Sequence, residues 1–161
     1  LALSFYVLAY GLASLKRPAI EELELPPILR YAAASYGIFI AVMFNFVWIS
    51  QLIPLLKMGD RIEYTFSVYI IDLVFIMPAF VIVAVLAVRK HAVGVVGLPA
   101  LFILGVGILS PLALAEVLKP SRYGIPVDPG EFWLYGILSL VFLIFATVYL
   151  VALRPSRLAG E

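Results

Sequence analysis

Apolar residues in this chain come in runs that are too long for the core of a water-soluble domain. Short stretches of charged residues, Pro and Gly separate them. A helix rises about 1.5 Å per residue, so about 20 apolar residues cross the hydrocarbon layer of a bilayer. Four runs reach that length, and a shorter one opens the chain. The pattern predicts helices over residues 1–15, 30–56, 64–88, 92–118 and 131–153.

Lipid tails offer no hydrogen-bond partners, so each spanning segment must form its backbone hydrogen bonds internally, which favours helices. A membrane β-barrel would show runs of about ten residues that alternate in polarity, and this sequence has none. The predicted fold class is all-α: a transmembrane helical bundle with four complete spanning helices and a partial one at the N-terminus. We expect residues 1–161 to form a single membrane domain, and we expect further sequence upstream of Leu1, which lies inside an apolar run.

Composition agrees with this class of protein. Hydrophobic residues make up 65% of the 161 positions and charged residues only 13%, with a mean hydropathy of +1.13. A formal net charge of +1 gives no reason to expect nucleic acid as a partner. There are no cysteines, which excludes disulfides, thiolate catalysis and Cys-ligated metals. The HExxH zinc motif is absent, and we expect no cofactor and no metal.

The distribution of Lys and Arg predicts the orientation in the membrane, because cytoplasmic loops carry more of these residues. One side of the predicted topology receives seven basic residues and the other receives four. The larger set should be cytoplasmic, which also places the C-terminus inside the cell. We expect the membrane to be the plasma membrane. The seven are Lys16, Arg17, Arg30, Arg89, Lys90, Arg154 and Arg157; the four are Lys57, Arg61, Lys119 and Arg122.

Asp72 is an acidic residue inside a predicted span, and such residues are functional candidates by default. It lies eight residues into the segment 64–88, roughly 12 Å below the end of the helix. An Asp near the centre of a span costs about 3 kcal/mol, while each surrounding Leu, Ile, Val or Phe returns about 0.3–0.6 kcal/mol. The helix should therefore insert, but Asp72 must be shielded from lipid.

The preceding segment offers partners for Asp72. It holds the only Asn and the only Gln of the chain, Asn45 and Gln51, with Trp48 between them at about the same depth as Asp72. Pro78 follows Asp72 by six residues and should kink the helix beside the acid. We expect Asp72, Asn45, Trp48, Gln51 and Pro78 to form an intramembrane polar site. The site either holds helices together through hydrogen bonds or binds a proton, a cation or a polar headgroup.

Other candidate positions have simpler explanations. Four glycines of the segment 92–118 are expected to be close-packing positions for a neighbouring helix, in this chain or in another subunit: Gly94, Gly97, Gly105 and Gly107. His91, the only histidine, should be solvated at the membrane boundary. Glu116 lies near the end of its span, and Glu131 is expected to favour a helix N-terminus through the macrodipole.

Several sequence elements together resemble a family of prokaryotic polytopic integral membrane proteins of unknown function. They are Trp48 to Pro54, the run Val68 to Asp72 with Pro78, Arg89-Lys90 followed by Gly94 and Leu98-Pro99, and Ile125 to Asp128. The most specific of these is Asp72 with Pro78. The resemblance covers nearly the whole chain and implies further helices upstream. It implies no substrate, cofactor or catalytic residue.

Three functional hypotheses follow. The leading one is a non-catalytic integral membrane protein, an accessory or structural subunit whose partners are the lipid bilayer and other membrane subunits or further copies of itself. The alternative is a small transporter or ligand-binding or ion-binding membrane protein centred on Asp72. A lipid-modifying enzyme is a third class, but it would need a second reactive residue, and the sequence offers none that is evident.

Overall fold

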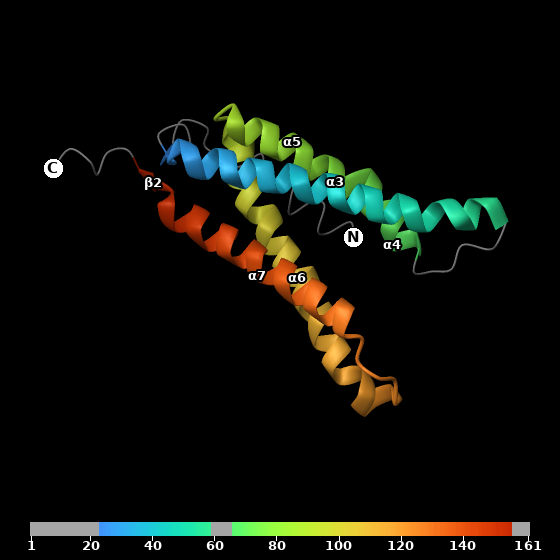
Figure 1. The fold of residues 1–161 in the computed structure, drawn as a ribbon. Coiled ribbons are helices and arrows are strands. Elements are labelled where there is room, and N and C mark those ends of the chain that lie inside the picture. The colour runs from blue at the N-terminus through green and yellow to red at the C-terminus, as the bar shows by residue number, and fades with distance from the viewer. Residues whose placement is uncertain (1–22, 59–65, 156–161) are drawn as a thin grey trace, which may run out of the picture. The chain divides into compact units, whose positions relative to one another are not determined.

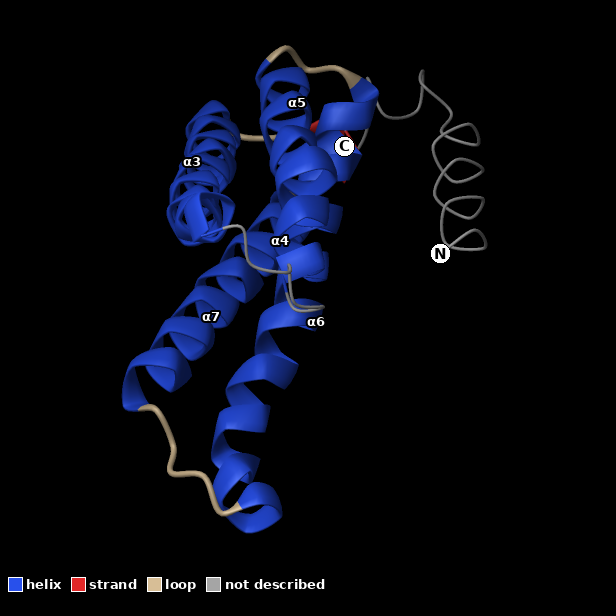
Figure 2. Ribbon diagram, turned by 90° about the vertical axis from the view of Figure 1, so that its right-hand side faces the viewer, coloured by secondary structure: helices blue, strands red, loops and turns tan. Residues whose placement is uncertain are grey.

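The computed structural model describes residues 23–58 and 66–155, and these residues are almost entirely helical (Figures 1 and 2). The predicted all-α class is confirmed. The predicted partial helix over residues 1–15 lies outside the described residues. The described residues form eight elements in chain order. Their bounds are β1 Leu23–Glu24, α3 Pro27–Met58, α4 Phe66–Ile71, the π-helix η1 Asp72–Ile76, α5 Met77–Val88, α6 Ala92–Tyr123, α7 Pro129–Ala152 and β2 Arg154–Pro155.

Four helical segments within the described residues are long and apolar enough to cross a membrane, which makes the chain a multi-pass membrane protein. They are Pro27–Pro54, Tyr69–Val88, Ala92–Tyr123 and Pro129–Ala152. The second of these continues from α4 through η1 into α5 without a break. With 32 residues each, α3 and α6 would be about 48 Å long, more than the roughly 30 Å of hydrocarbon. Such helices tilt or extend past the hydrocarbon.

Two helix ends differ from the predicted ones for clear local reasons. Helix α3 begins at Pro27 rather than near residue 30, because Pro is well suited to the first helical position, where no N–H is needed. Helix α6 continues past residue 118 and through Pro120 to Tyr123. It ends where Gly124 adopts a left-handed conformation, with φ +67°, and donates its N–H to the carbonyl of Pro120. Glycine, rather than proline, stops this helix.

The chain divides into two compact units between Leu98 and Pro99, and each is described separately. In the first unit, α3 and α5 run antiparallel and side by side (Figure 1). Their contact is made by small residues together with a few larger ones. Ala33, Gly37 and Ala41 of α3 repeat at four-residue spacing and are all buried. This small-xxx-small pattern lets two helix backbones approach closely. Opposite it, α5 buries Met77, Phe80, Ala84 and Ala87.

The second unit is the hairpin formed by the rest of α6 with α7. Phe102, Leu109 and Glu116 of α6 are buried at seven-residue spacing. On α7 the buried residues alternate between three-residue and four-residue steps: Ser139, Phe142, Ala146 and Tyr149. This spacing is that of a coiled-coil seam, in which one stripe of each helix faces the other. The opposite faces carry exposed apolar residues such as Leu140 and Ile144, as expected of helices solvated by lipid.

Candidate functional site

The predicted pairing of Asp72 with Trp48 is present in the first unit. Asp72 is partly buried at the start of η1, and its carboxylate lies within interaction distance of the Trp48 side chain on α3. The indole nitrogen of Trp48 is enclosed and makes no hydrogen bond of full geometry among the described residues, and the Asp72 carboxylate is the acidic group that lies beside it. An acid and a single N–H donor thus meet between two helices.

Tyr69 completes this arrangement, which sequence reasoning missed. Its ring stacks on the Trp48 indole with centroids 4.0 Å apart and an interplanar angle of 9°. Because Tyr69 precedes Asp72 by three residues, the two share one face of the segment. Phe44, one turn before Trp48 on α3, contacts the indole from its own helix at 5.5 Å. The signal was present in the i, i+3 spacing of Tyr69 and Asp72, but the aromatic stack could not be derived without the register of the two helices.

The helix is widened between Asp72 and Pro78, and the predicted kink itself stays a prediction. Residues 72–76 form a π-helix, and the N–H of Met77 donates to the carbonyl of Asp72, five residues earlier. A proline in a regular α-helix clashes with the carbonyl four residues before it. The shift to five-residue spacing just ahead of Pro78 relieves that conflict. Single π-turns of this kind occur frequently at functional sites.

Two predicted members of the site lie elsewhere. The side-chain amide of Asn45 donates to the carbonyl of Ala41 on its own helix, at 2.7 Å. Gln51 is exposed on α3. The described structure therefore brings together Trp48 and Asp72, beside Pro78, and it does not add Asn45 or Gln51 to that contact. The depth of Trp48 along its helix, counted from the sequence, correctly placed it beside Asp72. The polar character of Asn45 and Gln51 did not predict their contacts.

The predicted packing glycines differ in what surrounds them. A Cβ at Gly94 would lie 2.1 Å from the backbone nitrogen of Ala87, and one at Gly97 would lie 3.1 Å from Val83. At Gly105 a Cβ would lie 2.9 Å from the ring of Phe142. These three positions face a neighbouring helix within their own unit. A Cβ at Gly107 would meet nothing within 4 Å outside its own helix among the described residues, so its packing role stays a prediction.

His91 is exposed and has a structural task that the sequence did not reveal. Its Nδ1 accepts a hydrogen bond from the N–H of Val93 at 3.3 Å, and its carbonyl accepts from Gly94 and Val95. His91 is therefore the N-cap of α6. Directly before it, Lys90 has φ 57° and donates to the carbonyl of Ala87, while the N–H of His91 donates to that of Leu86. This pair of bonds is a Schellman motif that ends α5.

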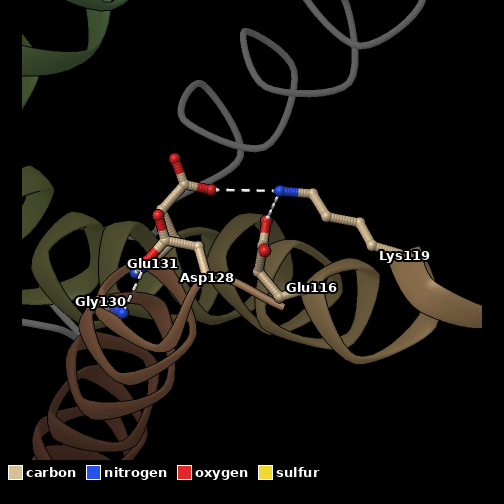
Figure 3. Close-up of polar contacts among 5 residues, drawn as sticks. All are labelled: Glu116, Lys119, Asp128, Gly130 and Glu131. Atoms are coloured by element: carbon tan, nitrogen blue, oxygen red, sulfur yellow. Dashed lines mark hydrogen bonds and ion pairs between the residues drawn. The ribbon is translucent and has the colours of Figure 1, made fainter. Parts of the chain in front are cut away.

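A second polar cluster closes the α6–α7 hairpin (Figure 3). Lys119 forms ion pairs with Glu116, one turn earlier on α6, and with Glu131 on α7, where the N–O distance is 3.3 Å. The Glu116 side chain is only 4% exposed, and its Oε2 is enclosed without a hydrogen-bond partner. Asp128 caps α7 by accepting from the N–H groups of Gly130 at 2.7 Å and Glu131 at 3.2 Å. Sequence reasoning considered Glu116 and Glu131 singly and missed the lysine that joins them.

Serine side chains provide one more interhelical contact in the second unit. The hydroxyl groups of Ser110 on α6 and Ser139 on α7 are 2.6 Å apart. Among the described residues, no group of three or more His, Asp or Glu side chains is arranged to hold a metal ion. Of the contacts described above, those of His91 and Asp128 cap helices, and those of Lys119 and of Ser110 with Ser139 join α6 to α7.

These features define a multi-pass α-helical membrane protein. No protein-family model, curated protein or solved structure matches the chain. The resemblance to a prokaryotic membrane family stays a prediction.

Proposed function

We propose that the protein is a non-catalytic integral membrane protein, an accessory or structural subunit of a larger membrane assembly. The observation that carries the proposal is the contact between Trp48, Tyr69 and Asp72. Asp72 lies against a side chain of the preceding helix, α3. In the second unit, Ser110 with Ser139 and Lys119 with Glu131 also join two helices. Interhelical polar contacts of this kind stabilise a bundle by about 0.6–2 kcal/mol each.

The exposed surface supports a role in an assembly. Outward-facing residues of α7 include Ile137, Leu140, Ile144, Val148 and Val151, all exposed. Lipid can solvate such a face, and the helix of a partner subunit can pack against it. Partner subunits or further copies of this chain are therefore part of the proposal.

The test is extraction of the full-length protein from its own membranes in a mild detergent, followed by measurement of the particle mass. A structural subunit should migrate in a discrete complex of fixed stoichiometry, well above the 17.7 kDa of the chain plus its detergent. Asp72→Asn keeps the shape and hydrogen-bonding capacity of the side chain, so the complex should persist. A monodisperse single chain in every detergent would contradict the proposal.

A second candidate function, an ion-binding or small-ligand-binding membrane protein centred on Asp72, is favoured by one specific observation. The acid sits on a π-turn next to stacked aromatic rings, and aromatic faces attract cations. In proteoliposomes, this function requires a cation or substrate flux that Asp72→Asn abolishes and Asp128→Asn leaves unchanged. Equal behaviour of the wild type and Asp72→Asn would exclude this candidate.

We further propose that the Arg89–Lys90 turn faces the cytoplasm, that the C-terminus lies on the same side, and that the membrane is the plasma membrane. The support is the excess of basic residues on that side of the topology. The chain has no cysteine, so single introduced cysteines report sidedness without background. A cysteine at position 89 should react with an impermeant maleimide only after the cell is opened.

A further inference from the structure

Arg30 is a buried cation that has no acidic partner among the described residues. It is 7% exposed and lies in the first turn of α3, within the span that begins at Pro27. Its Nε is enclosed and has no hydrogen-bond partner. The described ion pairs involve Lys119 rather than Arg30. Arginine is almost never buried unless it is paired. The ring of Tyr31, 5.3 Å from the guanidinium carbon, offers a cation–π contact but accepts no conventional hydrogen bond.

The backbone around Arg30 also favours an anion. Side chains of a helix lean toward its N-terminus, which brings the guanidinium toward the start of α3. There the N–H groups of Ile28 and Leu29 have no carbonyl of their own helix to bind, because four preceding residues are needed. The first turn of α3 contains no acidic residue, so no side chain of that turn compensates the positive end of the helix dipole.

Two further cations come from the turn between α5 and α6. Gly37 of α3 lies opposite Phe80 and Ala84 of α5, and the two helices run antiparallel. Moving seven residues back from Gly37 reaches Arg30, and moving seven residues forward from Ala84 reaches His91. The register therefore sets Arg30 level with exposed Arg89 and Lys90. Figure 1 shows the start of α3 and the end of α5 at the same end of the pair.

We propose that this basic end, formed by Arg30 with the N-terminus of α3 and by Arg89 with Lys90, binds the phosphate of an anionic phospholipid headgroup. Arg30 is three residues past Pro27, about 4.5 Å into the helix at 1.5 Å per residue, and so lies close to the end of the span that begins at Pro27. A guanidinium can donate two parallel hydrogen bonds to phosphate oxygens, and basic pockets between spanning helices select anionic lipids. The phosphate supplies the negative charge that the described residues do not.

Native mass spectrometry of the detergent-solubilised full-length protein tests the proposal. With phosphatidylglycerol added, the wild type should retain bound lipid at least tenfold more than with phosphatidylcholine. Arg30→Gln should remove that preference, and the double variant Arg89→Gln/Lys90→Gln should weaken it several-fold. Arg122→Gln, which removes an exposed cation of the second unit, is the matched control and should behave as wild type.

Two further measurements separate the sources of phosphate and guard against misfolding. Millimolar inorganic phosphate should not displace the lipid; if phosphate alone binds and raises the melting temperature in an Arg30-dependent way, the lipid assignment is overturned. Arg30→Lys keeps the charge without the bidentate donors, and it should fold while losing most of the preference. Equal retention of both lipids by the wild type, or an unchanged preference in Arg30→Gln or Arg30→Lys, would refute the site.

Discussion

The α3–α5 pair and the α6–α7 pair solve the same packing problem with different side chains. In the first pair, Ala33, Gly37 and Ala41 form a buried stripe of small residues on α3, and a Cβ at Gly37 would lie near Phe80 and Ala84 of α5. The second pair is filled by aromatic rings, with Phe102 5.7 Å from both Phe142 and Phe145. Small residues give close approach without adjustable parts, whereas rings fill space and can rotate. The two units should therefore differ in their tolerance of added volume.

Replacing Gly94 should have the largest effect on stability. A Cβ there would lie 2.1 Å from the nitrogen of Ala87 and 2.2 Å from the carbonyl carbon of Leu86, and backbone atoms cannot move aside alone. We expect Gly94→Ala to destabilise the protein by about 3 kcal/mol or more, seen as a large drop in melting temperature in mild detergent. Gly107→Ala is the control, and it should be neutral or slightly stabilising. Similar melting temperatures for the two variants would contradict the described α5–α6 turn.

An added methyl group at Gly105 should cost less, because its neighbour is a side chain. The Cβ would lie 2.9 Å from two ring carbons of Phe142, which is itself only 2% exposed and has little room to move. Overpacking of this kind costs about 1–3 kcal/mol. Phe142→Leu in the Gly105→Ala background should recover part of the loss, measured by thermal unfolding of all four members of the cycle. Additive effects of the two changes would show that the residues do not meet.

Lys90→Gly should stabilise the turn between α5 and α6. Lys90 has φ 57°, a left-handed conformation that costs a non-glycine residue about 1 kcal/mol or slightly more. Glycine removes that cost and also one positive charge. Lys90→Ala removes the charge alone, so only the glycine variant should melt at a higher temperature. A gain in both variants would point to charge rather than backbone conformation.

The smallest effect is expected from the hydrogen bond between Ser110 and Ser139. Their hydroxyl groups are 2.6 Å apart, and hydrogen bonds between membrane helices average about 0.6 kcal/mol in double-mutant cycles. Ser110→Ala and Ser139→Ala should therefore show a coupling energy of that order in unfolding titrations. A coupling indistinguishable from zero would remove this contact from the account of the hairpin.

The sequence predicted the spans well because hydrocarbon imposes a strong and local requirement on each one. It also paired Trp48 with Asp72, since counting along two helices that share a short connection gives their depths. It could not predict the neighbours of a side chain around the helix axis. The Asn45 amide donates to the carbonyl of Ala41 on its own helix. Tyr69 stacks on Trp48, a contact that depends on the rotation of both helices about their axes.

The alanine and glycine repeat of α3 is present in the sequence, but which face of α3 meets α5 depends on the rotation of both helices. Lys119 was counted only as a charge for orientation, and its bridge between Glu116 and Glu131 depends on where α7 returns beside α6. The continuation of α6 through Pro120 was missed because the glycine that ends the helix follows only at Gly124. The length of each apolar run predicts that a helix exists. Where a helix ends and which side chains it contacts depend on tertiary packing.

The four long apolar helices should cross a bilayer, and single-cysteine labelling of intact and opened cells tests this most directly. Arg89→Cys and Arg122→Cys lie near opposite ends of α6, and Leu140→Cys lies midway along α7. We expect an impermeant maleimide to label positions 89 and 122 from opposite sides of the membrane and to leave position 140 unlabelled until the protein is denatured. Ready labelling of position 140 in intact membranes, or of 89 and 122 from one side, would contradict the claim.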